Sequence, residues 1–376
     1  MLRSSLLATA ALGALVFSTS AAQAQCTPNN PGNGQTVTCA TDDTNGFSDG
    51  SDNVTINVSA QVTNASGDAF NLDGENNVVN NIAHQGYIDG SDEGIQFDGD
   101  DSQLYNGEGA WIEGDDRGVD ADDADGVLID NSGYIYGKGS DAVRVGDDAT
   151  VTNRATGTIQ GADDGLQTGD DAVITNDGII AATAPQASGS SEGITGGDRV
   201  KLVNSGTILA LDDAFQTGLD ADINNTGEIR SLENDGIDID TGKVVNSGTI
   251  IAMGVEDGID FDAGVDTASI STIENQLGGY IGGVVGVNVD AGNDARQFIT
   301  NAGTIVGVSG VAVFLEEGED AFTLLETGVV EGTVDLGADD DLLTLAGVQA
   351  ALVGGGGLFD GGADIDTIAF DGLAST

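Results

Sequence analysis

Short aliphatic runs recur along this chain, separated by Gly, Asn and Asp. The clearest repeat has the form Asn-x-Gly-x-Ile, and its copies begin at Asn131, Asn204, Asn225, Asn246 and Asn301. Looser copies end at Ile88, Ile112, Ile159, Ile180 and Ile281. The ten isoleucines from Ile88 to Ile305 are 24, 23, 24, 21, 28, 21, 21, 31 and 24 residues apart. A period of about 24 residues is typical of a solenoid built from stacked repeats.

Each repeat unit contains two further apolar runs. One follows an acidic residue and Gly, as in Asp235 to Ile237 and Asp257 to Ile259, and the other precedes the Asn, as in Val244 and Val245. All three runs are rich in β-branched residues, which predicts strands of roughly three to five residues joined by turns. Gly, Asn and Asp separate the strands, and Asn and Gly at the corners suit backbone positions with positive φ.

Three short strands in every repeat predict an all-β fold. The expected architecture is a single-stranded right-handed parallel β-helix (solenoid) of about a dozen coils of 21–24 residues. One coil cannot bury its inward Ile and Val, but a second coil about 4.8 Å above covers them and satisfies the backbone hydrogen bonds. Each buried aliphatic side chain contributes about 1.5–3 kcal/mol. Conformational entropy costs a similar amount, so stability accumulates over many coils.

The chain divides into four predicted segments. Residues 1–24 form a secretory signal peptide, because Arg3 precedes an apolar run and a small-x-small site ends at Ala24. Export leads to an oxidising compartment, where Cys26 and Cys39 are expected to form a disulfide. Residues 25–60 form an N-terminal cap tied by this bond, residues 61–315 the β-helix repeats, and residues 316–376 Gly/Asp-rich C-terminal coils.

Acidic residues dominate the charge of the chain. It has 63 Asp and Glu against 10 Lys and Arg, a net charge of −53. This charge repels phosphates and anionic lipids, which excludes nucleic acid and an anionic membrane surface as partners. One His and two Cys cannot form an ordinary zinc site. No motif requires a cofactor, and Ca²⁺ is the ion that the acidic pattern suggests.

A triplet of Asp residues recurs with the coil period. Asp235, Asp238 and Asp240 are followed 22 residues later by an identically spaced triplet. Matched carboxylates stacked about 5 Å apart repel each other by about 0.9 kcal/mol in water. A structural Ca²⁺ bound between them would relieve this repulsion. Two other interpretations stay open, namely a solvated acidic face and carboxylates that cap turn amides.

The C-terminal tail contains a related pattern. Residues 361–368 resemble the calcium-binding nonapeptide of RTX proteins, with Asp364 in place of the third Gly. The corresponding residues Asp320, Asp341 and Asp366 are 21 and 25 residues apart, so the tail is expected to continue the coils. The candidate Ca²⁺ ligands are therefore Asp235, Asp238, Asp240, Asp257, Asp260, Asp262, Asp364 and Asp366.

Catalytic motifs are sparse. His84, the only His, has no serine-hydrolase motif near it and is interpreted as a turn or surface residue. Arg117, next to Asp116, is the only Arg inside an Asp cluster. A pectate-lyase-like enzyme would use such an Arg with Asp-bound Ca²⁺, whereas a local ion pair is the simpler interpretation. Trp111 and Tyr105 have rings able to stack on a sugar, but two aromatic residues do not make a cleft.

Residues 25–376 resemble the passenger region of a proteobacterial type V autotransporter of the β-helix type. The shared features are the signal peptide, the Cys-x12-Cys pair that follows it, the V-x-N-x-G-x-I coils and the Gly/Asp-rich tail. The resemblance implies delivery through an outer-membrane β-barrel translocator. This chain shows no run of amphipathic barrel strands, so we expect that partner in a longer product or an adjacent gene.

The expected function is non-catalytic adhesion or surface interaction. The protein would be exported through the periplasm and act at the cell surface, associated with the outer membrane or outside the cell. Its ligand would be a glycan or a protein, bound by the loop face at residues 184–199 and the acidic ladders. Two alternatives remain, a carbohydrate-active enzyme of the polysaccharide lyase or hydrolase kind and a calcium-stiffened structural spacer.

Overall fold

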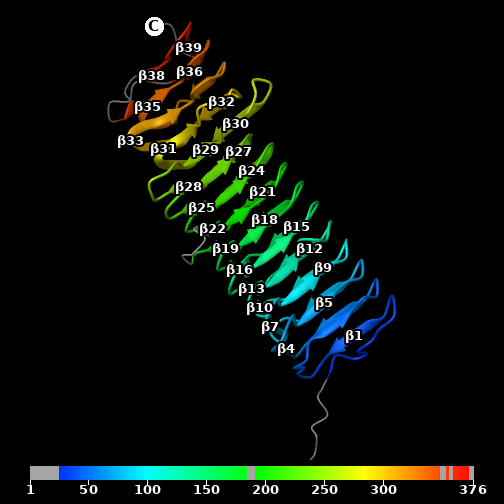
Figure 1. The fold of residues 1–376 in the computed structure, drawn as a ribbon. Coiled ribbons are helices and arrows are strands. Elements are labelled where there is room, and N and C mark those ends of the chain that lie inside the picture. The colour runs from blue at the N-terminus through cyan, green and yellow to red at the C-terminus, as the bar shows by residue number, and fades with distance from the viewer. Residues whose placement is uncertain (1–24, 184–190, 348–352, 355–358, 372–376) are drawn as a thin grey trace, which may run out of the picture.

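The protein is a β-solenoid of about 13 turns, as the sequence predicts. The computed structural model describes residues 25–183, 191–347, 353–354 and 359–371, and within these ranges it contains strands and no helix. The predicted signal peptide lies outside the described residues. In the part that is described, no helix has the length and hydrophobicity needed to cross a bilayer. The strands follow one another along a single axis in chain order (Figure 1).

Each full turn contributes one strand to each of three faces, and strands one turn apart pair in parallel. The first face consists of β1 (Thr36–Cys39), β3 (Thr55–Val58), β6 (Val78–Asn81), β9 (Gln103–Asn106), β12 (Leu128–Asn131), β15 (Thr150–Asn153), β18 (Val173–Asn176), β21 (Lys201–Asn204), β24 (Ala221–Asn225), β27 (Gly242–Asn246), β30 (Ile270–Asn275), β32 (Arg296–Asn301), β34 (Ala321–Leu324), β36 (Leu342–Ala346) and β39 (Thr367–Asp371).

The other two faces form one continuous sheet. The second face consists of β4 (Gln61–Asn64), β7 (Tyr87–Gly90), β10 (Trp111–Gly114), β13 (Tyr134–Gly137), β16 (Thr158–Gly161), β19 (Ile179–Ala182), β22 (Thr207–Ala210), β25 (Glu228–Ser231) and β28 (Thr249–Ala252). The third face consists of β2 (Phe47–Asp49), β5 (Phe70–Leu72), β8 (Ile95–Phe97), β11 (Val119–Ala121), β14 (Val143–Val145), β17 (Leu166–Gln167), β20 (Ile194–Thr195), β23 (Phe215–Thr217), β26 (Ile237–Ile239) and β29 (Ile259–Phe261).

Toward the C-terminus, longer strands run across both of these faces. They are β31 (Tyr280–Val289), β33 (Thr304–Phe314) and β35 (Val329–Asp335), and the short β37 (Val353–Gly354) and β38 (Phe359–Asp360) pair with β35. On the first face β34, β36 and β39 remain in parallel register, so the tail continues the stack as expected.

The isoleucine column predicted from the period is confirmed. Ile208 pairs with Ile229 and Ile229 with Ile250 on the second face, and all three side chains are fully buried. Strands alternate buried and more exposed positions, so each inward side chain lies on its counterpart in the next turn. Aliphatic columns of this kind fill the interior, which explains how a chain with 5% aromatic residues forms a core.

The repeat Asn residues form a buried amide ladder, which we call the Asn ladder. In each step the side-chain Nδ2 donates to the Oδ1 of the Asn one turn later, at 2.8–3.0 Å. Val58 and Leu324 occupy the equivalent positions at the two ends. The members of the ladder are Asn81, Asn106, Asn131, Asn153, Asn176, Asn204, Asn225, Asn246, Asn275 and Asn301.

The prediction that corner Asn and Gly residues have positive φ is wrong at the Asn-x-Gly-x-Ile motif, although it holds for Asn53, Asn76 and Gly126 at another corner. None of the ladder Asn residues has positive φ, and neither does Gly206 or Gly227. These glycines instead allow the backbones of successive turns to lie close together, because a Cβ on Gly227 would lie 2.1 Å from the carbonyl oxygen of Gly206. Positive φ occurs at another corner, before the first-face strands, at residues such as Asp148 and Asp171.

The predicted disulfide is present at the N-terminal end. Cys26 and Cys39 are bonded, their Cα atoms are 4.2 Å apart, and both side chains are buried. Cys39 ends β1 and pairs with Val58 of β3, so the bond ties residue 26 to the first stacked strand.

Candidate functional site

Aromatic side chains gather on the outside of the second face in three successive turns. Trp111 lies in register with Tyr87 on one side and Tyr134 on the other. The Trp111 and Tyr134 rings have centroids 4.0 Å apart, and Tyr136 lies 5.9 Å from Tyr134. These four residues, which we call the aromatic patch, include the only Trp and three of the five Tyr of the chain. All four are partly exposed to solvent.

Glu113 holds the aromatic patch in place. It accepts hydrogen bonds from Trp111 Nε1 at 2.7 Å and from the Tyr87 hydroxyl at 3.2 Å, and it pairs with Lys138 Nζ at 2.8 Å. Burial alone would raise the pKa of Glu113, but the hydrogen bonds from Lys138 and Trp111 outweigh it and lower the pKa. The Tyr134 hydroxyl donates to Gln160 in the next turn. Hydrogen bonds therefore hold the side chains of Tyr87, Trp111 and Tyr134 in position.

A pocket of about 490 Å³ adjoins the patch. Lys138 lies in its wall together with Asp89 and Asp115, and Asn64 and Ser91 supply further polar groups. Lys138 links pocket and patch, because its ammonium contacts Glu113 as well as Asp115 at 2.9 Å. Aromatic surface beside a few convergent polar groups is the composition of many ligand sites.

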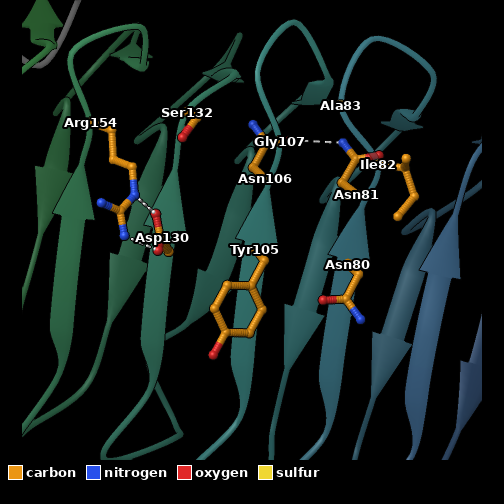
Figure 2. A pocket seen from close by; sticks show the side chains of 10 residues that line it. All are labelled: Asn80, Asn81, Ile82, Ala83, Tyr105, Asn106, Gly107, Asp130, Ser132 and Arg154. Atoms are coloured by element: carbon orange, nitrogen blue, oxygen red, sulfur yellow. Dashed lines mark hydrogen bonds and ion pairs between the residues drawn. The ribbon is translucent and has the colours of Figure 1, made fainter.

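A second pocket of about 330 Å³ lies across the corner, on the first face (Figure 2). Tyr105 stands there between Asn80 and Asp130 on neighbouring strands, and 38% of its surface is exposed. Arg154 donates two hydrogen bonds to Asp130, at 2.6 and 2.5 Å. Tyr105 on β9 and Trp111 on β10 flank one turn, so the two aromatic residues singled out from the sequence occupy adjacent faces of one coil.

Acidic side chains form a buried column where the chain enters the third face. Here a backbone amide donates to the carboxylate one turn earlier, as from Asp235 to Asp213 at 2.8 Å and from Asp257 to Asp235 at 2.6 Å. For these residues the amide-capping interpretation is confirmed. The buried acid column consists of Asp68, Glu93, Asp141, Asp164, Glu192, Asp213, Asp235 and Asp257.

Arg117 occupies one step of this column, between Glu93 and Asp141. Its guanidinium lies 3.6 Å from Glu93 and 3.4 Å from Asp141, and it also pairs with Asp116 at 3.0 Å and Asp120 at 3.5 Å. The local ion pair expected from the sequence is thus present, within a larger network. An Arg surrounded by four carboxylates is held in its charged form, because burial lowers its pKa less than those carboxylates raise it.

Burial strongly perturbs the titration of the buried acid column. It raises the pKa of Asp235 to about 9, that of Asp213 to about 7 and that of Asp141 to about 6, with further contributions from neighbouring carboxylates. Burial likewise raises the pKa of Glu93 and of Glu192. An unfolded Asp has a pKa of about 3.9. Between about pH 4 and pH 9 the folded protein therefore holds more protons than the unfolded chain.

We predict that stability falls as pH rises through this window. Each titrating group contributes a slope of at most about 1.4 kcal/mol per pH unit, because the folded state must release protons that the unfolded state has already lost. Thermal melts in EDTA at constant ionic strength should give a higher melting temperature at pH 5.5 than at pH 8.5. Asp213→Asn should reduce the difference, whereas Asp222→Asn, on the exposed side of β24, should leave it unchanged. A melting temperature that increases with pH would contradict the prediction.

Other acidic residues of the sequence cap amides at the corner that precedes the first face. Asp147, for example, accepts from the Asp170 amide at 2.8 Å and Asp170 from the Asp198 amide at 2.9 Å. In the tail, Asp366 accepts from the Asp341 amide at 3.3 Å, and Asp364 is exposed. Neither tail residue belongs to a group of convergent acidic side chains among the described residues.

The remaining candidate ligands lie on the outside of the third face. Asp238 on β26 pairs in register with Asp260 on β29, so the predicted one-coil stacking of these carboxylates is confirmed. One oxygen each from Asp238, Asp260 and Asp262 lie within 4.8 Å of one another. Asp240 precedes Asp262 by one turn and is half-buried. The structure therefore separates Asp235 and Asp257, which cap amides, from the other four residues of the two triplets.

The loop face predicted to bind ligand is described only in part. Residues 184–190 lie outside the described residues, and the segment that follows contains β20 and Arg199, which pairs with Asp170 and Asp171. His84 lies in an exposed turn, as expected.

The aromatic patch escaped the sequence analysis, although a signal existed. Tyr87, Trp111 and Tyr134 each directly precede the repeat isoleucine of three successive units, so aligning the units on that Ile places them in one outward column. The Glu113 contacts had no such signal, because the repeat does not show which polar side chains of a face bond to one another.

Comparison with protein-family models, with curated proteins and with solved structures finds no match for this chain. The β-solenoid is consistent with a β-helix passenger.

Proposed function

We propose that this protein is an exported β-helix, similar to an autotransporter passenger, that acts without catalysis at the cell surface by binding an uncharged glycan. The proposal extends the adhesion function expected from the sequence. Its main support is the aromatic patch: the only Trp and three of the five Tyr cluster on one face of three successive turns in an aromatic-poor chain.

The chemistry of the patch favours a sugar. Tyr and Trp combine apolar ring surface with a hydrogen-bonding group, which suits the apolar faces and hydroxyl groups of a pyranose. Rings already held by Glu113 and Gln160 lose little conformational entropy on binding. The adjoining pocket adds Asn64, Ser91 and Lys138 as hydrogen-bonding partners.

The charge of the protein selects against acidic glycans. A net charge of −53 repels anionic polymers over long distances. Lys138 does not reverse this effect locally, since Asp89, Glu113 and Asp115 surround it. We therefore expect neutral polysaccharides to bind and acidic ones such as polygalacturonate to bind weakly.

A glycan-cleaving enzyme is the competing function. Arg117, the candidate base, is engaged by four carboxylates, which leaves it poorly suited to act as a base. Reducing-end assays on neutral and acidic polysaccharides, with and without Ca²⁺, separate the two functions. Cleavage that is lost in Asp116→Asn and Arg117→Lys would replace the binding function with an enzymatic one.

The decisive test is binding to immobilised neutral polysaccharides, namely β-glucan, starch, mannan and chitin. We expect the folded protein to bind at least one of them and Trp111→Ala to bind it about tenfold more weakly or worse, a loss of about 1.4 kcal/mol. Tyr280→Ala is the matched control, because Tyr280 occupies the same outward column on β31 but lies outside the patch. Equal effects of both variants, or no binding to any of the four polysaccharides, would refute the proposal.

A further inference from the structure

The outward carboxylates of β26 and β29 differ from every acidic column described above. In those columns a backbone amide of a neighbouring turn donates to the carboxylate. Asp238 and Asp260 point outward from their strands and receive side-chain amides instead. Gln216 Nε2, one turn earlier, donates to Asp238 Oδ2 at 2.7 Å, and Asn288 Nδ2, one turn later, donates to Asp260 Oδ1 at 2.7 Å.

These two amides bracket the pair of stacked carboxylates, with Gln216 before Asp238 and Asn288 after Asp260. The oxygen left over on Asp238, Oδ1, is buried and has no hydrogen-bond partner. Only 8% of the Asp238 surface is exposed, so water cannot fully solvate this group. A buried carboxylate oxygen without a partner is costly unless a cation or donor satisfies it.

The charge around this oxygen is uncompensated. Asp240, Asp262 and Asp290 lie near enough to raise the pKa of Asp238, which reaches about 6 with burial as the main cause. None of these carboxylates pairs with Lys or Arg within the described ranges. The four turns that precede Asp238 in the same outward column contain Arg144, Gln167, Thr195 and Gln216, and the earlier Asp120 lies beside Arg117.

A second group of acidic side chains provides a contrast. Asp68, Asp92 and Glu93 also converge, but Arg117 lies 3.6 Å from Glu93 and offsets their charge. No oxygen of that group is buried without a partner. Convergence of carboxylates alone therefore does not distinguish the Asp238 group, whereas its unpartnered buried oxygen and its lack of a cation do.

We propose that Asp238, Asp260 and Asp262 bind one Ca²⁺ that joins two successive turns of the solenoid. Their oxygens lie within 4.8 Å of one another. A Ca²⁺ ion with bonds of about 2.3–2.6 Å spans oxygens about 4.6–5.2 Å apart across its centre, whereas Mg²⁺ with bonds of about 2.0–2.1 Å spans only about 4.2 Å. Water would complete the coordination, since Ca²⁺ takes about six to eight oxygens. This site is independent of the proposed glycan binding.

The test is calorimetric titration of the EDTA-treated, dialysed full chain with CaCl₂ at pH 8, with MgCl₂ and NaCl at matched ionic strength as comparisons. We expect one saturable Ca²⁺ site per chain, with Mg²⁺ binding at least about tenfold more weakly. Asp238→Asn and Asp262→Asn should each weaken Ca²⁺ binding by about tenfold or more, and Asp222→Asn should not. Asp262 is exposed, so its substitution tests the site without touching buried packing.

Melting temperatures provide a second test, because Asp238→Asn should have different effects in EDTA and in Ca²⁺. In EDTA, Asp238→Asn should melt no lower than the unmodified protein, because the substitution removes a buried unpaired charge. With Ca²⁺ present the unmodified protein should melt higher than the variant, since only it gains from the bound ion. The proposal is overturned if CaCl₂ acts no differently from MgCl₂ and NaCl, or if Asp262→Asn leaves Ca²⁺ binding unchanged.

Discussion

Asn225→Ala should lower the free energy of unfolding by about 2–6 kcal/mol, because it removes at least four hydrogen bonds of a buried side chain, each worth about 0.5–1.5 kcal/mol. Asn225 Oδ1 accepts from Asn204 Nδ2 at 2.8 Å and from the Gly227 amide at 3.2 Å. Its Nδ2 donates to Asn246 Oδ1 at 2.9 Å and to the Thr249 carbonyl at 3.1 Å. The substitution therefore interrupts the Asn ladder and also frees backbone groups of two turns.

Asn224 provides the matched control. It is the neighbouring residue of the same strand, has the same side chain and points to solvent. Asn224→Ala should change the free energy of unfolding by less than about 0.5 kcal/mol. Urea denaturation followed by circular dichroism measures the difference, and hydrogen exchange of the turns around residues 204–249 shows whether the loss is local. Similar effects of both substitutions would mean that the ladder contributes little to stability.

Gly227→Ala should lower the free energy of unfolding by more than about 3 kcal/mol, which exceeds the usual range for overpacking. The effect is large because the added methyl group would collide with backbone atoms rather than with a movable side chain. A Cβ at residue 227 would lie 2.1 Å from the Gly206 carbonyl oxygen. The same close contact recurs between Gly206 and Gly178 and between Gly248 and Gly227. Making room for one methyl group therefore requires two hydrogen-bonded turns to separate.

Gly50→Ala is the corresponding control. Nothing lies within 4 Å of a Cβ at Gly50, and its φ is not positive. Reduced freedom of the unfolded chain should make this substitution neutral or stabilising by up to about 1 kcal/mol. The urea concentration at the unfolding midpoint, measured for both variants and the unmodified protein, gives their relative stabilities. A Gly227→Ala protein as stable as Gly50→Ala would show that the turns are not packed at the distance described.

Most of the fold was predicted from the period of the sequence repeat. Residues of like type about two dozen positions apart do lie over one another, as in Ile208, Ile229 and Ile250 and in Asp238 and Asp260. The disulfide also followed from the sequence, since the two Cys of the chain lie close together at one end. The role of the repeat Asn did not follow, because both a positive-φ corner and a buried ladder require Asn at that spacing.

The candidate sites depend on side-chain burial and hydrogen-bond partners, which the repeat period does not predict. Asp235 and Asp238 belong to one triplet, yet Asp235 caps an amide at a corner while Asp238 points outward from a strand with an oxygen unsatisfied. A shift of a few residues around a turn changes burial and partners completely. Aligning the repeats places Tyr87, Trp111 and Tyr134 in one column, but only the structure shows their ring contacts and their hydrogen bonds to Glu113.

By itself, the sequence determined which residues lie above and below each other, because the repeated motif marks equivalent positions in successive turns even where the turns differ in length. Only the tertiary structure decided which side chains meet around a turn, how deeply each carboxylate is buried and which polar atoms remain without partners. Those properties depend on the path of the backbone through each corner, and Gly and Asp allow several such paths at almost equal local cost.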